Sequence, residues 1–194
     1  MRNAEISRKT LETSVKIRLN IDGSGKSSIN SGIGFFDHML TLFARHGSFD
    51  IDVSCNGDLN VDGHHSVEDI GITLGDAFCK ALGKKESITR YGSFYVPMDE
   101  ALAFAAVDIS GRPFIVYDSG AVAPMIGEYD TELTEEFLRA FAFHAGITLH
   151  AKVLYGTNSH HKIEAVFKAL GHAMKIACQE DKTIKGVLST KGTL

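Results

Sequence analysis

The stretch His64-His65-Ser66-Val67-Glu68 recurs as His160-His161-Lys162-Ile163-Glu164 in the other half of this 194-residue chain. The two copies of this His-His-x-x-Glu frame lie 96 residues apart (160 minus 64). Because imidazole and carboxylate groups are common ligands of transition metals, the repeat indicates a duplicated metal site in a chain built from two related halves. The alternative is a pair of polar, solvated helix starts.

The spacing within each frame predicts how metal ions would be shared. If each frame opens a helix, residues four apart point the same way, so the first histidine and the glutamate form a pair. The second histidine lies about 100° around the helix and must serve a different ion. The simplest closed arrangement holds two ions, each bound by a His/Glu pair from one half and a lone histidine from the other.

A helix predicted before each frame adds one ligand by symmetry. In the first half this helix carries His38, and the corresponding residue in the second half is Glu136. The two predicted ligand sets exchange when the halves are exchanged. They are His38, His65, His160 and Glu164 for one ion, and Glu136, His161, His64 and Glu68 for the other.

Composition is that of an ordinary globular protein, with 44% hydrophobic and 23% charged residues. The formal net charge is -4 and no run of Lys and Arg exceeds two residues, so neither nucleic acid nor an anionic membrane is an expected partner. The chain has no apolar signal core at its N-terminus and no apolar stretch long enough for a membrane span. The three cysteines form no CxxC frame, which favours reduced thiols and a cytoplasmic location.

Hydrophobic periodicity predicts the same order of elements in both halves. Alternation predicts strands over residues 13–21, 49–55, 88–95, 101–109, 114–117 and 147–153. Helical spacing predicts helices over residues 35–45, 64–82, 132–145 and 159–179. Ser66 and Ser159 are expected to help cap the two frame helices. No linker separates the halves, so we expect an α+β fold in one compact unit, with residues 1–87 and 88–194 as pseudo-symmetric halves of mostly antiparallel sheet and helices.

Several longer motifs resemble one known family. They are Gly34-Phe35-Phe36-Asp37-His38-Met39-Leu40, His64-His65-Ser66-Val67-Glu68-Asp69, Pro97-Met98-Asp99-Glu100-Ala101, Ser110-Gly111-Arg112-Pro113, Asn158-Ser159-His160-His161 and Ser189-Thr190-Lys191-Gly192. In this order, and over essentially the whole chain, they resemble imidazoleglycerol-phosphate dehydratase of histidine biosynthesis. The resemblance implies two related halves of the ribosomal S5 domain 2-like fold, each with a four-stranded sheet. It also implies a homo-oligomeric shell of 24 subunits built from trimers, with two Mn(II) ions in each site between subunits.

The resemblance also implies roles for individual residues. It matches seven of the predicted metal ligands, while many family members carry His where this chain has Glu136. It implies acid/base catalysis and substrate contact for Glu12. It implies substrate or phosphate contacts for His46, Arg90, Arg112, Lys168, Ser189, Thr190 and Lys191. Guanidinium and ammonium groups bind phosphate oxygens well, although each alone is ordinarily a solvated surface charge. His144 and His172 have no paired ligand at metal spacing.

The implied reaction is removal of water from imidazole-glycerol phosphate to give imidazole-acetol phosphate, a carbon–oxygen lyase reaction without redox change. A metal bound to the substrate's imidazole would favour its deprotonated form and help expel the adjacent hydroxyl, while Glu12 would move protons. Two other classes stay open: a dinuclear metallohydrolase acting on a phosphate ester, and a metal-storing shell protein without turnover. Release of inorganic phosphate would indicate the first, and absence of a ketone product the second.

Overall fold

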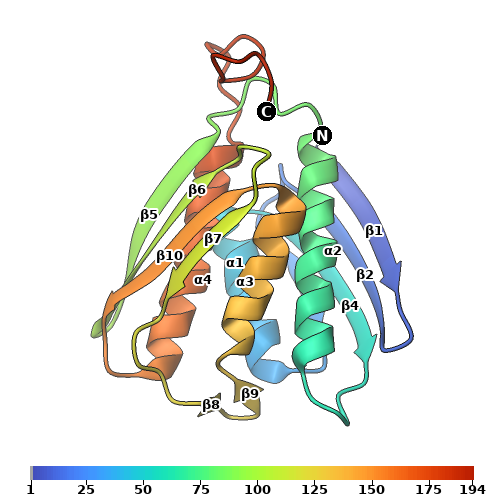
Figure 1. Ribbon diagram of the computed structural model, residues 1–194, viewed down its shortest axis with the longest axis vertical. Coiled ribbons are helices and arrows are strands. Elements are labelled where there is room, and N and C mark those ends of the chain that lie inside the picture. The colour runs from blue at the N-terminus through green and yellow to red at the C-terminus, as the bar shows by residue number, and fades with distance from the viewer. Residues whose placement is uncertain (1) are drawn as a thin grey trace.

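The computed structural model describes residues 2–194 and contains two four-stranded sheets with four helices between them (Figure 1). The first sheet, in the order β1-β2-β4-β3, consists of β1 (Asn3–Lys9), β2 (Thr13–Asn20), β3 (Ser27–Asn30) and β4 (Asp50–Gly57). The second sheet, in the order β5-β6-β10-β7, consists of β5 (Tyr91–Met98), β6 (Ala101–Asp108), β7 (Phe114–Asp118) and β10 (Thr148–Tyr155). The helices are α1 (Gly34–Gly47), α2 (His64–Leu82), α3 (Leu133–Ala145) and α4 (Ser159–Cys178).

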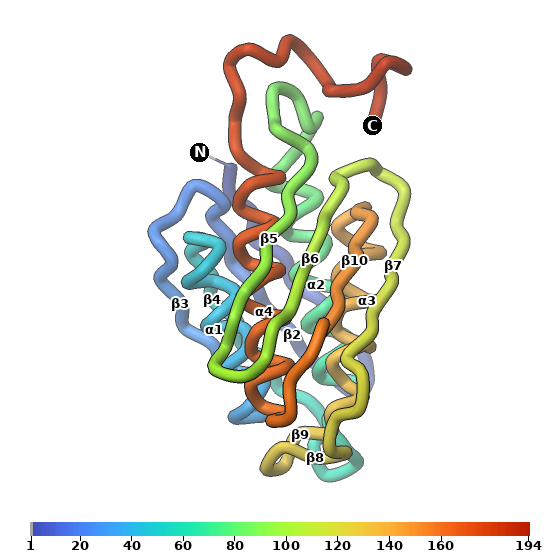
Figure 2. Tube along the Cα trace, turned by 90° about the vertical axis from the view of Figure 1, so that its left-hand side faces the viewer, coloured from blue at the N-terminus to red at the C-terminus, as the bar shows by residue number. Residues whose placement is uncertain are grey.

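The two sheets have the same topology. In each sheet two pairs of neighbouring strands are antiparallel, and the last pair, β3 with β4 or β7 with β10, is parallel. In each half one helix precedes the third strand of this order and another follows it. The second half adds a short hairpin of β8 (Met125–Ile126) and β9 (Tyr129–Asp130), which lies at the lower end of Figure 2. The expected α+β fold in two similar halves is therefore confirmed.

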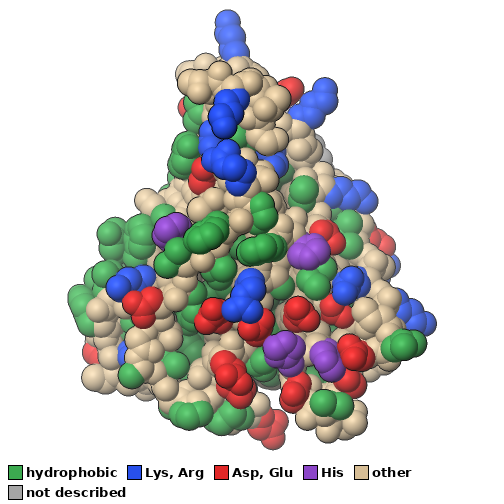
Figure 3. All heavy atoms as spheres, viewed as in Figure 1, with side chains coloured by type: hydrophobic (Ala, Val, Ile, Leu, Met, Phe, Trp, Pro, Cys, Tyr) green, Lys and Arg blue, Asp and Glu red, His purple; other side chains and the backbone are tan. Residues whose placement is uncertain are grey.

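The outer faces of the two sheets differ in polarity. On the second sheet Tyr95, Phe114 and Val116 are 58%, 59% and 44% exposed. Figure 3 shows hydrophobic side chains on the side of the molecule where β5 lies. On the first sheet, Lys16 and Arg18 both bind the exposed carboxylate of Glu5. The second sheet therefore has an exposed apolar surface that the first sheet lacks.

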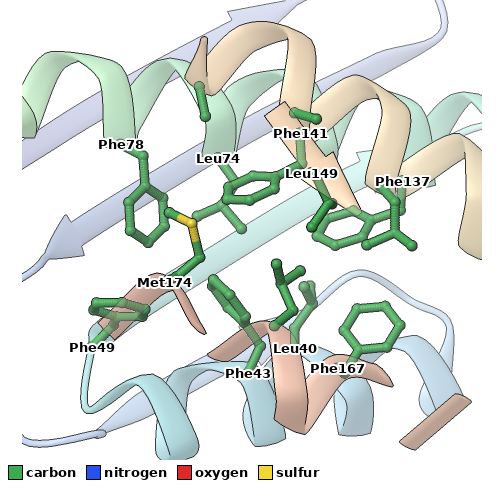
Figure 4. Close-up of a cluster of buried hydrophobic side chains, with 14 of the residues drawn as sticks. Leu40, Phe43, Phe49, Leu74, Phe78, Phe137, Phe141, Leu149, Phe167 and Met174 are labelled. Atoms are coloured by element: carbon green, nitrogen blue, oxygen red, sulfur yellow. The ribbon is translucent and has the colours of Figure 1, made fainter. Parts of the chain in front are cut away.

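The inner faces of the sheets pack against the helices. In β2, Val15, Ile17 and Leu19 are at most 2% exposed, and the residues between them are exposed, as the alternation predicts. Aromatic rings from the helices meet in the centre of the molecule, where Phe43 of α1 lies edge-on to Phe141 of α3 with ring centroids 5.9 Å apart (Figure 4). Each large apolar side chain buried in this way contributes about 1.5–3 kcal/mol of stability.

Glycines at equivalent positions let the helices approach closely in both halves. A Cβ atom on Gly75 of α2 would lie 2.8 Å from the carbonyl oxygen of Phe141 on α3. A Cβ atom on Gly171 of α4 would likewise lie 2.8 Å from the carbonyl oxygen of Phe43 on α1. These glycines are 96 residues apart (171 minus 75), the same spacing as the two His-His frames. The α2/α3 and α1/α4 pairs are therefore two copies of one packing arrangement.

Some local expectations differ from the structure. The strand expected from Ile88 begins at Tyr91, and β1 and β3 are strands that the weak alternation of their sequences does not predict. Asn158, not Ser159, caps α4, because its side chain accepts a hydrogen bond from the backbone N–H of His161 at 3.2 Å. Ser66 is fully buried against β4 and does not cap α2. Within residues 2–194 no helix is long and apolar enough to cross a membrane.

Candidate active site

Both His-His-x-x-Glu frames open helices, as their spacing predicts. α2 begins at His64 and α4 at Ser159, so each frame occupies the first turns of its helix. The two helices start at the same end of the molecule, the lower end in Figure 1. The frames are therefore presented by equivalent parts of the two halves.

Three predicted ligands come together within one chain. Nε2 of His160 lies 3.0 Å, and Nε2 of His38 3.4 Å, from the same Oε2 atom of Glu164. Each residue offers a ligand atom within 4.8 Å of the other two, and no other such group of His, Cys, Asp or Glu occurs in residues 2–194. An ion bound at about 2.1 Å by ligands at right angles separates them by about 3 Å, so this trio fits a divalent metal.

Lys168 lies next to the trio. Its Nζ is 2.5 Å from Oε1 of Glu164, which leaves Oε2 facing the two imidazoles. Burial alone would raise the pKa of Glu164, but Lys168, helped by hydrogen bonds from His160 and His38, offsets this effect and lowers the pKa. Glu164 is therefore ionised at neutral pH, as a metal ligand must be.

The second histidine of each frame is held through Nδ1 by a carboxylate. Nδ1 of His65 lies 3.0 Å from Asp58 Oδ2, and Nδ1 of His161 lies 2.8 Å from Glu100 Oε2. These hydrogen bonds are the largest causes that raise the pKa of each histidine. A hydrogen bond at Nδ1 orients the ring and leaves Nε2 for a metal. Neither histidine joins the His38 trio within a single chain.

The second predicted ligand set is not assembled within one chain. Glu136 on α3 instead binds the guanidinium of Arg139, at 2.8 and 2.9 Å. His64 lines a pocket of about 720 Å³ between the starts of α1 and α2 and the β8–β9 hairpin. Glu68 forms no group of three ligands with these residues in the described part of the chain.

Apart from Lys168, which lies beside the metal trio, the predicted phosphate contacts lie at the opposite end of α4. The backbone N–H of Arg90 donates to the carbonyl of Ala177 at 2.9 Å, in the last turn of the helix. The Arg90 guanidinium binds both oxygens of Asp108, at 2.7 and 3.0 Å, and the Leu188 carbonyl at 2.6 Å. Arg112 lies exposed in the β6–β7 connection, and the remaining predicted contacts in the C-terminal segment are Ser189, Thr190 and Lys191.

These two groups are far apart in one chain. Ala177 lies 13 positions after Glu164 in the chain (177 minus 164). Since an α-helix rises 1.5 Å per residue, the metal trio and the Arg90 region are about 20 Å apart along α4. On the face drawn in Figure 3, Lys and Arg side chains gather at the upper end and most Asp and Glu side chains lie in the lower half.

Two further predicted site residues are Glu12, which lies near the first frame, and His46, which pairs with His172 on α4 between Glu164 and Ala177. Glu12, in the turn between β1 and β2, places Oε2 3.8 Å from Nδ1 of His65, and its side chain is 54% exposed. Nδ1 of His46 lies 3.0 Å from Nε2 of His172, whose ring stacks on Phe94 with centroids 4.2 Å apart. Burial is the largest cause that lowers the pKa of both His46 and His172.

Sequence reasoning missed the carboxylates that hold the frame histidines. Asp58 and Glu100 are 7 and 61 residues from their partners, and both lie outside regular elements. No local motif marks Asp58. Glu100 falls within the motif Pro97-Met98-Asp99-Glu100-Ala101, and the symmetry of the hairpins gives a second signal, because Glu100 occupies in the β5–β6 turn the place that Glu12 occupies in the β1–β2 turn.

Known proteins with similar sequences and structures belong to one family. Residues 31–174 match the family model described as imidazoleglycerol-phosphate dehydratase. The chain is 60% identical over 193 residues to the imidazoleglycerol-phosphate dehydratase of Acetivibrio thermocellus, covering 100% of this chain and 99% of that protein. It is 59% identical over 194 residues to that of Thermoanaerobacter pseudethanolicus, covering 100% of both.

Two solved structures of the same enzyme share the fold. The Pyrococcus furiosus structure has a TM-score of 0.85 at 38% identity, covering 97% of this chain and 100% of that chain. The Staphylococcus aureus structure has a TM-score of 0.83 at 40% identity, covering 92% and 99%. The chain therefore belongs to the imidazoleglycerol-phosphate dehydratase family, whose members are hydro-lyases of histidine biosynthesis.

Proposed function

We propose that this protein dehydrates imidazole-glycerol phosphate to imidazole-acetol phosphate as a Mn(II)-dependent enzyme. The observation that carries the metal requirement is the trio of His38, His160 and Glu164, in which one buried carboxylate oxygen faces two imidazole nitrogens at 3.0 and 3.4 Å. A mixed set of imidazole and carboxylate donors suits Mn(II). The three cysteines are free thiols, in keeping with a cytoplasmic location.

We infer that two Mn(II) ions bind in each site. His38, His65, His160 and Glu164 would hold one ion, and Glu136, His161, His64 and Glu68 the other. In a single chain neither lone histidine, His65 or His161, joins its set, so we assign these contacts to a neighbouring subunit. Bound there, Mn(II) would supply Lewis acidity toward the imidazole of the substrate.

Glu12 is the proposed acid/base group. Its carboxylate is half exposed and reaches the first frame through the β1–β2 turn. It would take the proton from the substrate carbon and give a proton to the departing hydroxyl, so that a C–H and a C–O bond break and water leaves. The enol left behind then becomes the ketone by moving its hydroxyl proton to carbon.

The proposed phosphate contacts are charged groups near the C-terminus. Arg112 and Lys191 are exposed and can donate charge-assisted hydrogen bonds to phosphate oxygens, with Ser189 and Thr190 beside Lys191. Of the five N–H donors of the Arg90 guanidinium, three are used by Asp108 and the Leu188 carbonyl. Arg90 therefore keeps donors for phosphate while anchoring the C-terminal segment. Lys168 and His46 complete the proposed substrate contacts.

We propose that the site forms between subunits of a homo-oligomer, with 24 subunits built from trimers as the family resemblance implies. A separation of about 20 Å along α4 is too long for one small substrate to reach both the metal trio and the phosphate contacts of one chain. The exposed apolar surface of the second sheet supports assembly, because such surfaces mark protein interfaces.

Turnover by protein stripped of metal and reloaded with Mn(II) tests the proposed reaction. We expect formation of a ketone that depends on Mn(II), with the phosphate retained in the product. Release of inorganic phosphate without a ketone would indicate a metallohydrolase. Binding of Mn(II) without either product would indicate metal storage.

Mixing two damaged variants tests the shared site. His160→Ala removes a metal ligand, and the double variant Arg112→Ala/Lys191→Ala removes phosphate contacts. If these groups come from different subunits, oligomers reassembled from both proteins should regain activity that neither has alone. Mixing His160→Ala with Glu164→Gln is the matched control and should restore nothing. No recovery in oligomers shown by mass to contain both chains would contradict the shared site.

A further inference from the structure

The β1–β2 and β5–β6 hairpins are copies of each other. Arg8 lies opposite Val15 in the first ladder, and Val96 lies opposite Ala103 in the second. The Val96–Ala103 pair therefore lies 88 residues after the Arg8–Val15 pair at both positions (96 minus 8 and 103 minus 15). The same shift places the turn that contains Glu12 on the turn that contains Glu100.

The two equivalent carboxylates are held in different ways. Glu100 accepts hydrogen bonds from the backbone N–H groups of Thr157 and Asn158 at 3.0 and 2.7 Å, and binds His161 at 2.8 Å. Within residues 2–194 no hydrogen bond reaches the carboxylate of Glu12, whose Oε2 lies 3.8 Å from Nδ1 of His65. Since no side-chain hydrogen bond fixes the Glu12 carboxylate in the described chain, its position is set through the backbone that carries it.

A polar network with a buried centre and a partly exposed Arg8 ties that backbone to α2. The carboxylate of Asp69 accepts hydrogen bonds from the Thr13 hydroxyl and from Nε of Arg8, the latter at 2.7 Å. Asp69 and Thr13 are only 5% and 4% exposed. Asp69 lies four residues after His65, on the same face of the helix. The hairpin is thus fixed one helical turn from the histidine that Glu12 approaches.

Thr10 extends this network into the turn. Its hydroxyl oxygen accepts hydrogen bonds from the backbone N–H groups of Glu12 at 3.1 Å and Thr13 at 2.9 Å. The backbone on which Glu12 sits is therefore connected to Asp69 through Thr13. Its side chain alone remains free to move.

The second half has no polar network at the positions equivalent to Arg8, Thr13 and Asp69; its hairpin turn is held through Glu100 itself. The shifts of 88 residues for the hairpin and 96 for the helix give the equivalents of Arg8, Thr13 and Asp69. These equivalents are Val96, Ala101 and Ala165, which are 8%, 1% and 0% exposed. The second hairpin therefore uses its turn carboxylate to dock, whereas the first docks through Thr13 and Asp69 and leaves Glu12 unbonded. A buried ion pair often stabilises no more than apolar packing of similar volume, so this arrangement points to a role other than stability.

We propose that Arg8, Thr13 and Asp69 are positioning residues that hold Glu12 at the first frame for proton transfer. This inference rests on the acid/base role proposed for Glu12. The three residues act through Glu12 and do not touch the substrate themselves.

The triple variant Arg8→Val/Thr13→Ala/Asp69→Ala tests this by giving the first half the apolar set of the second. It should keep its fold, its Mn(II) affinity and its KM. Its kcat should fall about 10- to 100-fold, because a misplacement of about 1 Å can cost that much. Amide hydrogen exchange should become faster at Glu12 and Thr13 but not at Asn158, which reports on the other turn.

Single substitutions at Thr13 give a matched pair. Thr13→Ser keeps the hydroxyl and should retain most of kcat, whereas Thr13→Val has nearly the same shape and should lose it. If Glu12→Gln is inactive but the triple variant or Thr13→Val has a normal kcat, the positioning role of the network is wrong and the acid/base role of Glu12 stands. Normal turnover by Glu12→Gln would overturn the acid/base role and the network together. A triple variant that fails to fold would assign the network to stability and also overturn the proposal.

Discussion

The two halves of this protein share one fold, yet their equivalent carboxylates have different partners. Glu100 is fixed by two backbone N–H groups and His161, whereas the carboxylate of Glu12 forms no such bonds in the described chain. His38 lies with His160 and Glu164 in a group that could bind a metal ion, while its equivalent Glu136 binds Arg139. The duplicated fold sets where each side chain lies, and its hydrogen-bond partners decide what it can do.

Loss of a metal ligand should have the largest effect. His160→Ala removes one imidazole of the trio, so Mn(II) affinity and turnover should both fall by more than about 100-fold, the upper range for residues that only support a ligand. Metal content after dialysis, kcat and oligomer size measure this. His64→Ala, in the other frame, should behave the same way if two ions bind.

His144→Ala is the matched control for these ligand variants. His144 is a helical histidine bound to Asp76 at 2.9 Å and outside both predicted ligand sets. The His144→Ala variant should leave metal content and turnover unchanged. An effect of His160→Ala without any effect of His64→Ala would show that the halves are not equivalent in metal binding.

Loss of a phosphate contact should have an intermediate effect. Arg112→Ala or Lys191→Ala removes a charge-assisted hydrogen bond worth about 1.5–3 kcal/mol, so KM should rise about tenfold or more. Inhibition by phosphate-containing analogues should weaken in parallel. Lys152→Ala, which removes an exposed lysine paired with Asp118, should change neither. An equal loss of affinity for a neutral triazole fragment would indicate general damage instead.

Metal binding should weaken as pH falls. Asp58 and Glu100 raise the pKa of His65 and His161 above the ordinary 6.5. Since a metal binds only neutral imidazole, protons should compete with Mn(II) already above that pH and release metal together with activity. Titration of Mn(II) affinity from about pH 8 to about pH 5.5 covers this range. An affinity independent of pH would contradict the assignment of both histidines.

In the metal-free chain the same raised pKa values make falling pH favourable for folding stability, although it is unfavourable for metal binding. A histidine whose pKa is raised by folding adds stability below its unfolded pKa, near 6.5, and this stability is lost as pH rises through the folded value. The Tm of the metal-free protein should therefore gain from these two pairs at low pH. Asp58→Asn and Glu100→Gln should each reduce that gain.

Glu136→His should have the smallest effect. It places an imidazole where the equivalent residue of the other half, His38, already has one, so metal content and turnover should stay close to those of the unchanged protein. Stability should change by less than about 0.5 kcal/mol, as for most surface substitutions. Glu135→His, one residue earlier and also bound to Arg139, is the control. Loss of metal in Glu136→His alone would show that this position requires a carboxylate.

Sequence patterns predicted features that follow from helix periodicity or from the repeat. The frames open α2 and α4 because their spacing suits one helix face, and the repeat grouped His38 with His160 and Glu164, which lie close together although His38 is distant in sequence. A long-range pair that neither pattern marks could not be predicted in this way. The ion pair of Arg90 with Asp108 depends on the register of β5 with β6, which places Tyr91 opposite Asp108, and alternation alone does not fix a register.

The proposed division of roles is that Glu12 transfers protons while its equivalent Glu100 supports a metal ligand. The most direct test measures kcat and the Kd for Mn(II) in both Glu12→Gln and Glu100→Gln. Glu12→Gln should lower kcat by about two to four orders of magnitude and leave the Kd unchanged. Glu100→Gln should raise the Kd about 10- to 100-fold, with most of the turnover returning at saturating Mn(II). Normal turnover in Glu12→Gln, or an unchanged Kd in Glu100→Gln, would contradict this division of roles.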